Sequence, residues 1–284
     1  MSLAHPHIMF PLPNPAAPPI AADFPHRWDA QAILDACEQH LRDHNSALDQ
    51  EQATTGLDAL DEVQVHPLLA SALKAAGLGV LREHPLPGPD GQLIDPKRLP
   101  KHSQRERCDL VLLPTNRHAL IDWVREQKDR SCWQESLFQT LAMPPPLPDA
   151  SLCVNAWDAF WLEVKVVAQH AFVDGVPRPN AAWSSQLVSS LTHDLAKLAA
   201  HHHHDAARPG SSLPNAALLL VVFAETPELI AHDLPIAFHR ALDKAVAFRS
   251  PLHASRRDAS SPPGFAIADR IGNAWCQCIL VPAC

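Results

Sequence analysis

The chain has 284 residues, of which 46% are hydrophobic and 19% are charged, as in an ordinary globular protein with a sizeable core. Its formal net charge of -8 argues against a surface coated in positive charge for nonspecific nucleic-acid binding, although a local basic groove stays compatible with it. Seven cysteines without a CxxC pair do not suggest a disulfide framework. The longest apolar run is too short for a membrane helix, and no secretory signal is recognisable. A cytoplasmic protein without membrane contact is therefore expected.

The pattern along the chain predicts helices and strands behind an extended arm. Residues 1–27 are Pro-rich and are expected to form an arm outside a single domain at 28–284. Apolar residues at helical spacing predict helices at 28–48, 57–76, 183–200 and 235–248, and a shorter one at 123–141 inside an insertion at 115–152. Apolar runs predict strands at 80–86, 107–114, 159–167, 216–224 and 275–283. This order indicates an α/β fold in which one mixed sheet has helices on both faces.

Three features accompany the predicted helices. Pro67 lies inside the helix at 57–76, so this helix is expected to start or to be kinked at the proline. The run from His201 to His204 is interpreted as a solvated loop rather than a metal patch, because a tetrahedral metal site needs ligands from separate elements. Asp194 and Lys197, three residues apart on one predicted helix, are interpreted as a surface pair.

The predicted strand at 159–167 carries two charges within an apolar run. Strand alternation places Glu163 and Lys165 on one face, roughly 7 Å apart, while the other face is apolar. An edge strand with a solvated face is the simpler explanation. The alternative is a metal site, in which a carboxylate binds a hard divalent cation and the ammonium orients an attacking water. Asp109, in the predicted strand at 107–114, supplies a second carboxylate, and aspartate is both disfavoured in strands and rarely buried unpaired.

The order of these residues resembles the active-site pattern of the PD-(D/E)xK nuclease superfamily. Asp109 stands in one strand, Glu163-Val164-Lys165 in the next, and a helix follows. The proline that usually precedes the aspartate is absent, and Arg107-Cys108 stand there instead. The resemblance covers about residues 56–224. It implies the restriction-endonuclease-like fold, a three-layer α/β/α sandwich with a central mixed β-sheet.

The resemblance also implies metal-dependent hydrolysis of a phosphodiester in nucleic acid, with DNA expected before RNA. Asp109 and Glu163, with the carbonyl of Val164, would bind Mg²⁺ or Mn²⁺, and Lys165 would position the water. Members of the superfamily often carry a further acid in the helix before the first strand. Glu62 is the best match for that acid in this chain, and Asp58 and Asp61 are its rivals.

Three further residues are considered as accessory to this site. His66 follows Glu62 by one helical turn and either faces the same site or simply belongs to the start of the helix. Glu83 either neighbours Asp109 or pairs with a nearby arginine. Gln186 stands where some relatives place a glutamine that touches the site.

Two other interpretations stay open. A noncatalytic relative could keep the fold as a binding or structural module, which the acidic net charge and the absence of tyrosine favour. An unrelated α/β protein could carry the charged pair on a solvated strand face. Retention of Asp109, Glu163 and Lys165 in apolar strands favours the nuclease, because such charges are costly to bury without a role. Many such folds act as dimers, so a homodimer is considered, although no segment of the sequence identifies an interface.

Overall fold

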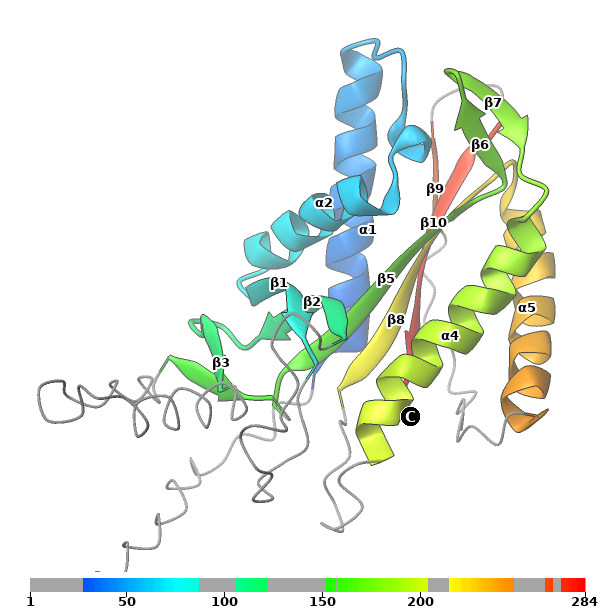
Figure 1. The fold of residues 1–284 in the computed structure, drawn as a ribbon. Coiled ribbons are helices and arrows are strands. Elements are labelled where there is room, and N and C mark those ends of the chain that lie inside the picture. Colours follow the sequence, from blue (N-terminus) through cyan, green and yellow to red (C-terminus); the bar gives the residue numbers. More distant parts are fainter. Residues whose placement is uncertain are drawn as a thin grey trace, which may run out of the picture.

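The computed structural model describes residues 28–86, 106–121, 152–156, 158–203, 215–247, 264–267 and 272–283. The expected arm at 1–27 and the expected helix at 123–141 lie outside these residues. A six-stranded sheet forms the centre, in the order β1-β2-β5-β8-β10-β9 (Figure 1). Its strands are β1 (Gly79–Pro85), β2 (Arg107–Leu113), β5 (Phe160–Ala168), β8 (Ala216–Ala224), β9 (Phe265–Ala266) and β10 (Trp275–Pro282). Strands β5 and β8 are parallel and the other neighbours are antiparallel, so the sheet is mixed, as predicted.

Two pairs of short strands lie outside the central sheet. Strand β3 (Ala119–Ile121) pairs in parallel with β4 (Cys153–Asn155). Strands β6 (His170–Val173) and β7 (Val176–Pro179) form an antiparallel hairpin directly after β5. Both residues of its turn, Asp174 and Gly175, have positive φ, as a two-residue hairpin turn requires. None of these four strands was predicted, because strands this short show little periodicity.

Helices cover both faces of the sheet (Figure 1). Helices α1 (Ala30–Gln50) and α2 (Glu62–Ala75), with a short 3₁₀ turn η1 (Leu57–Ala59) between them, share one apolar cluster with the sheet. Helices α4 (Trp183–His203) and α5 (Pro227–Ala247) share a second cluster on the opposite face. Leu162 and Val164 of β5 belong to the first cluster, whereas Trp161 and Val167 belong to the second. The prediction of an α/β fold with a mixed central sheet is therefore confirmed.

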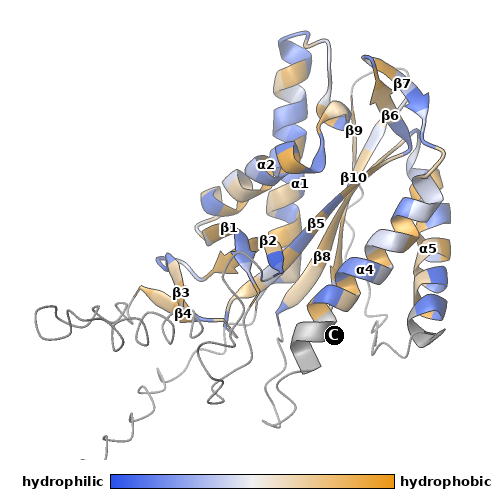
Figure 2. Cartoon of the chain, in the orientation of Figure 1, coloured by the Kyte–Doolittle hydropathy of each residue, from blue (hydrophilic) through white to orange (hydrophobic). Residues whose placement is uncertain are grey.

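The centre of the sheet is apolar apart from one strand. All nine residues of β8 are buried, as its uninterrupted apolar run predicted. Figure 2 shows this hydrophobic strand beside β5, whose middle is hydrophilic. Among the described residues, no helix is both long enough and apolar enough to cross a membrane.

Helix α2 begins at Glu62, so of the two alternatives for Pro67, a start or a kink, the start is wrong. Asp61 caps the helix: its carboxylate accepts a hydrogen bond from the backbone N–H of Gln64, whose side chain accepts one from the N–H of Asp61. Such a capping box satisfies two N–H groups that the first turn leaves open, and it outweighs the proline signal. Pro67 lies inside the helix. The capping box consequently presents Glu62 and His66 on consecutive turns.

Two other helix boundaries differ from the prediction. Helix α5 begins at Pro227 rather than at Pro235, because Thr226 accepts a hydrogen bond from the N–H of Leu229 at 3.4 Å and proline is favoured in the first helical position. Helix α4 continues through residues 201–203, so the predicted loop is wrong for this part of the histidine run.

Candidate functional site

The site lies where strands β2 and β5 separate. They pair over three residue pairs only, Leu110–Leu162, Val111–Trp161 and Leu112–Phe160. The next pair in this register would be Asp109 and Glu163, and there the backbone ladder stops. The Val164 N–H donates instead to Oδ2 of Asp109 at 2.8 Å. From this point to Ala168, β5 pairs with β8 alone among the described strands, so its other edge is open to side chains.

The same position interrupts the pairing of β1 with β2. Arg82 pairs with Leu110 and His84 with Cys108, but Glu83, which lies opposite Asp109, does not join the ladder. Glu83 has a φ of 51°, which is uncommon for a residue other than glycine. Of the two alternatives for Glu83, this register agrees with the one that places it next to Asp109.

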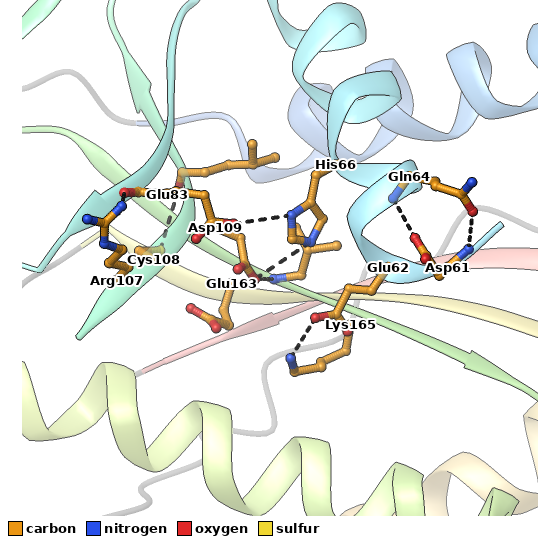
Figure 3. Close-up of polar contacts among 12 residues, drawn as sticks. Asp61, Glu62, Gln64, His66, Glu83, Arg107, Cys108, Asp109, Glu163 and Lys165 are labelled. Atoms are coloured by element: carbon orange, nitrogen blue, oxygen red, sulfur yellow. Dashed lines mark hydrogen bonds and ion pairs between the residues drawn. The ribbon is translucent and has the colours of Figure 1, made fainter. Parts of the chain in front are cut away.

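His66 lies beside these two acids and faces both, as Figure 3 shows. Its side chain is only 3% exposed, with Nδ1 3.7 Å from Oε1 of Glu83 and Nε2 4.0 Å from Oδ2 of Asp109. Its Nε2 has no hydrogen-bond partner although it is buried. Glu62, His66 and Asp109 each offer one ligand atom, and these atoms lie within 4.8 Å of one another. This group can hold a metal ion, and His66 lies beside Glu62 and Asp109, which are both expected site residues.

Lys165 belongs to the open edge of β5. Its Nζ donates to Oε1 of Glu62 at 2.9 Å, which links the strand to α2 (Figure 3). Burial alone would lower the pKa of Lys165, but the hydrogen bond to Glu62 and the charge of Asp194 raise it above its usual value. Lys165 is therefore an ammonium group held between acids from two helices, and it can donate hydrogen bonds to a developing negative charge.

Glu163 points toward α4. Lys165 shares this side of β5, because Trp161 and Val167 of the same alternation belong to the α4 cluster and the charge of Asp194 acts on Lys165. Its side chain is 4% exposed, and Oε1 accepts from Nζ of Lys197 at 2.8 Å. Oε2 is buried without a hydrogen-bond partner. Burial, and next the charge of Asp109, raise the pKa of Glu163 to about 7. Strand β5 lies inside the sheet and Glu163 lies in its core, so the interpretation of a solvated edge-strand face is wrong.

Asp194 and Lys197 of α4 are part of this site, and their prediction as a surface pair is wrong. Asp194 is only 4% exposed, and burial raises its pKa while the charge of Lys165 opposes that rise. A signal for its burial was present in the sequence. Asp194 lies three residues after Leu191 and four before Leu198, which places it on the apolar stripe of the helix.

Gln186 is not brought to these acids by any contact among the described residues. Its side-chain oxygen accepts from Nδ2 of Asn180 at 2.8 Å, and the same Nδ2 donates to the carbonyl of Ala168 at 2.8 Å. Gln186 therefore helps to join the end of β5 to the start of α4.

The cluster carries more acid than base. Five carboxylates face two ammonium groups, which leaves an excess of three negative charges if all of them ionise and His66 is neutral. The carboxylates are those of Glu62, Glu83, Asp109, Glu163 and Asp194, and the ammonium groups are those of Lys165 and Lys197. Two buried polar atoms, Nε2 of His66 and Oε2 of Glu163, lack partners. A divalent cation at Glu62, His66 and Asp109 would reduce the excess of negative charge and give Nε2 of His66 a partner, because carboxylate oxygen and imidazole nitrogen are common ligands of such ions. Glu163 is not part of this group of ligand atoms.

No protein-family model matches this chain, and no match is found among curated proteins or solved structures.

Proposed function

We propose that this chain is a metal-dependent nuclease with the restriction-endonuclease-like, three-layer α/β/α fold, and that it hydrolyses phosphodiester bonds in DNA. One observation carries the proposal. Glu62, Asp109, Glu163 and Lys165 come from three separate elements and meet where β2 and β5 separate. The mixed sheet with helices on both faces is the arrangement that this fold requires.

The proposal places a divalent cation beside Asp109. Asp109 and Glu163 would hold it through carboxylate oxygens, and the Val164 carbonyl would add a ligand, because the N–H and C=O of one strand residue point to the same side. Glu62 and His66 would contribute on the α2 side. The imidazole favours Mn²⁺ over Mg²⁺, since nitrogen ligands suit transition ions. When bound, such an ion stabilises the negative charge of a phosphoryl transition state.

The remaining chemistry belongs to the chain's own residues. Lys165 keeps its proton on Nζ and would donate hydrogen bonds to the attacking water and to a phosphoryl oxygen. Glu62, which accepts from that ammonium, holds it in place. With this function we place the protein in the cytoplasm and expect a homodimer, whose mass analytical ultracentrifugation would measure.

The test is nicking of supercoiled plasmid DNA with Mn²⁺ or Mg²⁺. The wild-type chain should convert the plasmid to open circles, and EDTA should stop the reaction. Glu163→Gln should lose the activity, because it removes a ligand charge and keeps the side-chain shape. Glu38→Gln is the matched control: Glu38 is also a buried glutamate, 3% exposed and bonded to Arg42 on α1, outside the site. Equal cleavage by the wild type and Glu163→Gln would refute the proposal.

A noncatalytic binding module is the second candidate. It is favoured by the ion pairs Lys165–Glu62 and Lys197–Glu163, which neutralise two acids without a metal. Retarded migration of DNA in a gel, without cleavage at any Mn²⁺ or Mg²⁺ concentration, would support this candidate over the nuclease.

A further inference from the structure

The two oxygens of Glu163 have different surroundings. Oε1 accepts from Lys197 at 2.8 Å, whereas Oε2 has no hydrogen-bond partner. The side chains of Glu163 and Lys197 are 4% and 16% exposed, so the pair lies mostly out of water. A buried carboxylate with one unpaired oxygen is poorly satisfied. Oε2 of Glu163 is thus a free acceptor for a cation, while Oε1 already contacts the ammonium of Lys197.

The lysine that contacts Glu163 is not the one next to it in sequence. Lys165, two residues along β5, is bonded to Glu62 at 2.9 Å. Lys197 reaches Glu163 from α4, on the opposite face of the sheet from α2. Lys165 therefore pairs with Glu62. Lys197 pairs with Glu163, the acid that the proposed function assigns as a metal ligand.

A divalent cation and the ammonium of Lys197 compete for this carboxylate. An ion bound to Glu163 lies about 2.0–2.6 Å from the carboxylate oxygens, and the ammonium lies 2.8 Å from one of them. Two positive charges this close repel strongly in a buried site. Binding of the ion would be easiest if the ammonium moved away.

Asp194 provides a place for the ammonium to go. It lies three residues before Lys197 on α4 and is buried. Burial raises its pKa, and the charge of Lys165 and, less strongly, that of Lys197 oppose the rise. Residues three apart on a helix are neighbours on its surface. A change in the conformation of the Lys197 side chain alone could therefore transfer its contact from Glu163 to Asp194.

We propose that Lys197 is a positioning residue that holds Glu163 in the ion-free protein, and that a divalent cation enters by exchange as the ammonium moves to Asp194. The proposal rests on the proposed function, because it takes Glu163 as a ligand of the metal. It makes affinity for the ion depend on a helix residue that does not bind the ion.

The experiment is calorimetric titration of the full chain with MnCl₂ after removal of metal with EDTA and dialysis. Lys197→Met and Lys197→Gln should both bind Mn²⁺ roughly tenfold more tightly than the wild type, because no ammonium competes. The Gln variant keeps an N–H donor for Glu163, so it should fold even if the Met variant does not. Circular dichroism shows which of the two variants is folded. Lys74→Met removes an exposed lysine from α2 and should change the affinity by less than about twofold.

Two double variants test the route of exchange. In Glu163→Gln the Lys197→Met change should give no gain, since the contested carboxylate is absent. Asp194→Asn should weaken Mn²⁺ binding when Lys197 is present and leave it unchanged in Lys197→Met. These comparisons are double-mutant cycles, which isolate the coupling between two residues.

The outcomes separate this inference from the nuclease proposal. If Lys197→Met and Lys197→Gln bind Mn²⁺ no more tightly than the wild type, the exchange is refuted, even if the wild type nicks plasmid DNA. If both variants gain affinity through Glu163 and the wild type does not cleave DNA, the exchange is supported and the nuclease proposal fails. A merely structural role of Lys197 would change the stability of the chain and leave its affinity for Mn²⁺ unaltered.

Discussion

The pKa of Glu163 leads to a prediction about stability and pH. Burial raises this pKa from 4.5 to about 7 in the folded chain. The folded protein therefore holds the proton more tightly than the unfolded chain does. The stability that this proton contributes is full below pH 4.5 and is lost as the pH rises through about 7.

The size of this loss follows from the shift. Each pKa unit corresponds to about 1.4 kcal/mol, so the rise from 4.5 to about 7 lowers the free energy of unfolding by about 3 kcal/mol at pH 8. Glu163→Gln replaces the carboxyl group with a neutral one of the same shape and removes this loss. The variant should match the wild type at pH 4.5 and be about 3 kcal/mol more stable at pH 8 without metal.

Urea denaturation followed by tryptophan fluorescence, with EDTA present, measures the difference at both pH values. Other groups titrate in both proteins, so only the difference between them reports on Glu163. Glu51→Gln, at an exposed residue after α1, is the control, and its free energy of unfolding should stay close to that of the wild type at both pH values because exposed charges contribute little. The reasoning is refuted if Glu163→Gln gains no stability over the wild type between pH 4.5 and pH 8, or gains it in the acid range instead.

The remaining predictions concern the hydrogen bonds and ion pairs around the site. Asp109→Asn keeps an oxygen acceptor for the N–H of Val164, so the free energy of unfolding should change by less than about 1 kcal/mol in urea while Mn²⁺ affinity in calorimetry falls roughly tenfold or more. Unchanged affinity would exclude Asp109 as a ligand. Lys165→Met breaks a partly exposed pair with Glu62, so it should cost about 1 kcal/mol or less in the same denaturation assay and still abolish plasmid nicking. Nicking at the wild-type rate would show that this lysine does not assist the reaction. Asn273→Ala removes a fully buried side chain with three hydrogen bonds and should cost about 2–4 kcal/mol, yet Mn²⁺ affinity should stay unchanged because none of those bonds involves the acidic cluster.

Much of the fold could be predicted from the apolar pattern of the chain. The uninterrupted run of β8 and the alternation in β5 reflect how much of each strand is buried, and burial is a property that residue types encode directly. Boundaries were harder wherever two local signals disagreed. At α2 the Asp61 capping box and Pro67 both mark a helix start, and the two hydrogen bonds of the box prevailed.

The sequence alone pointed to Asp109, Glu163 and Lys165, because charges within apolar strands are conspicuous. It could not show which partners they have. Alternation predicts that Glu163 and Lys165 share a face, and the charge of Asp194 on α4 acts on both. It does not predict that Glu163 bonds to Lys197 and Lys165 to Glu62. Lys165 can bond to Glu62 because β2 separates from β5 at Asp109 and leaves that edge of the strand open.

Lys197 shows most clearly what only the tertiary structure decided. Periodicity assigns a residue to one face of its own helix, and this was enough to reveal that Asp194 lies on the apolar stripe. Contact between Lys197 and Glu163 depends on how α4 is placed along β5, which is determined by the packing of their apolar side chains together. Such a placement arises from many weak contacts between distant segments, so no local stretch of residues encodes it.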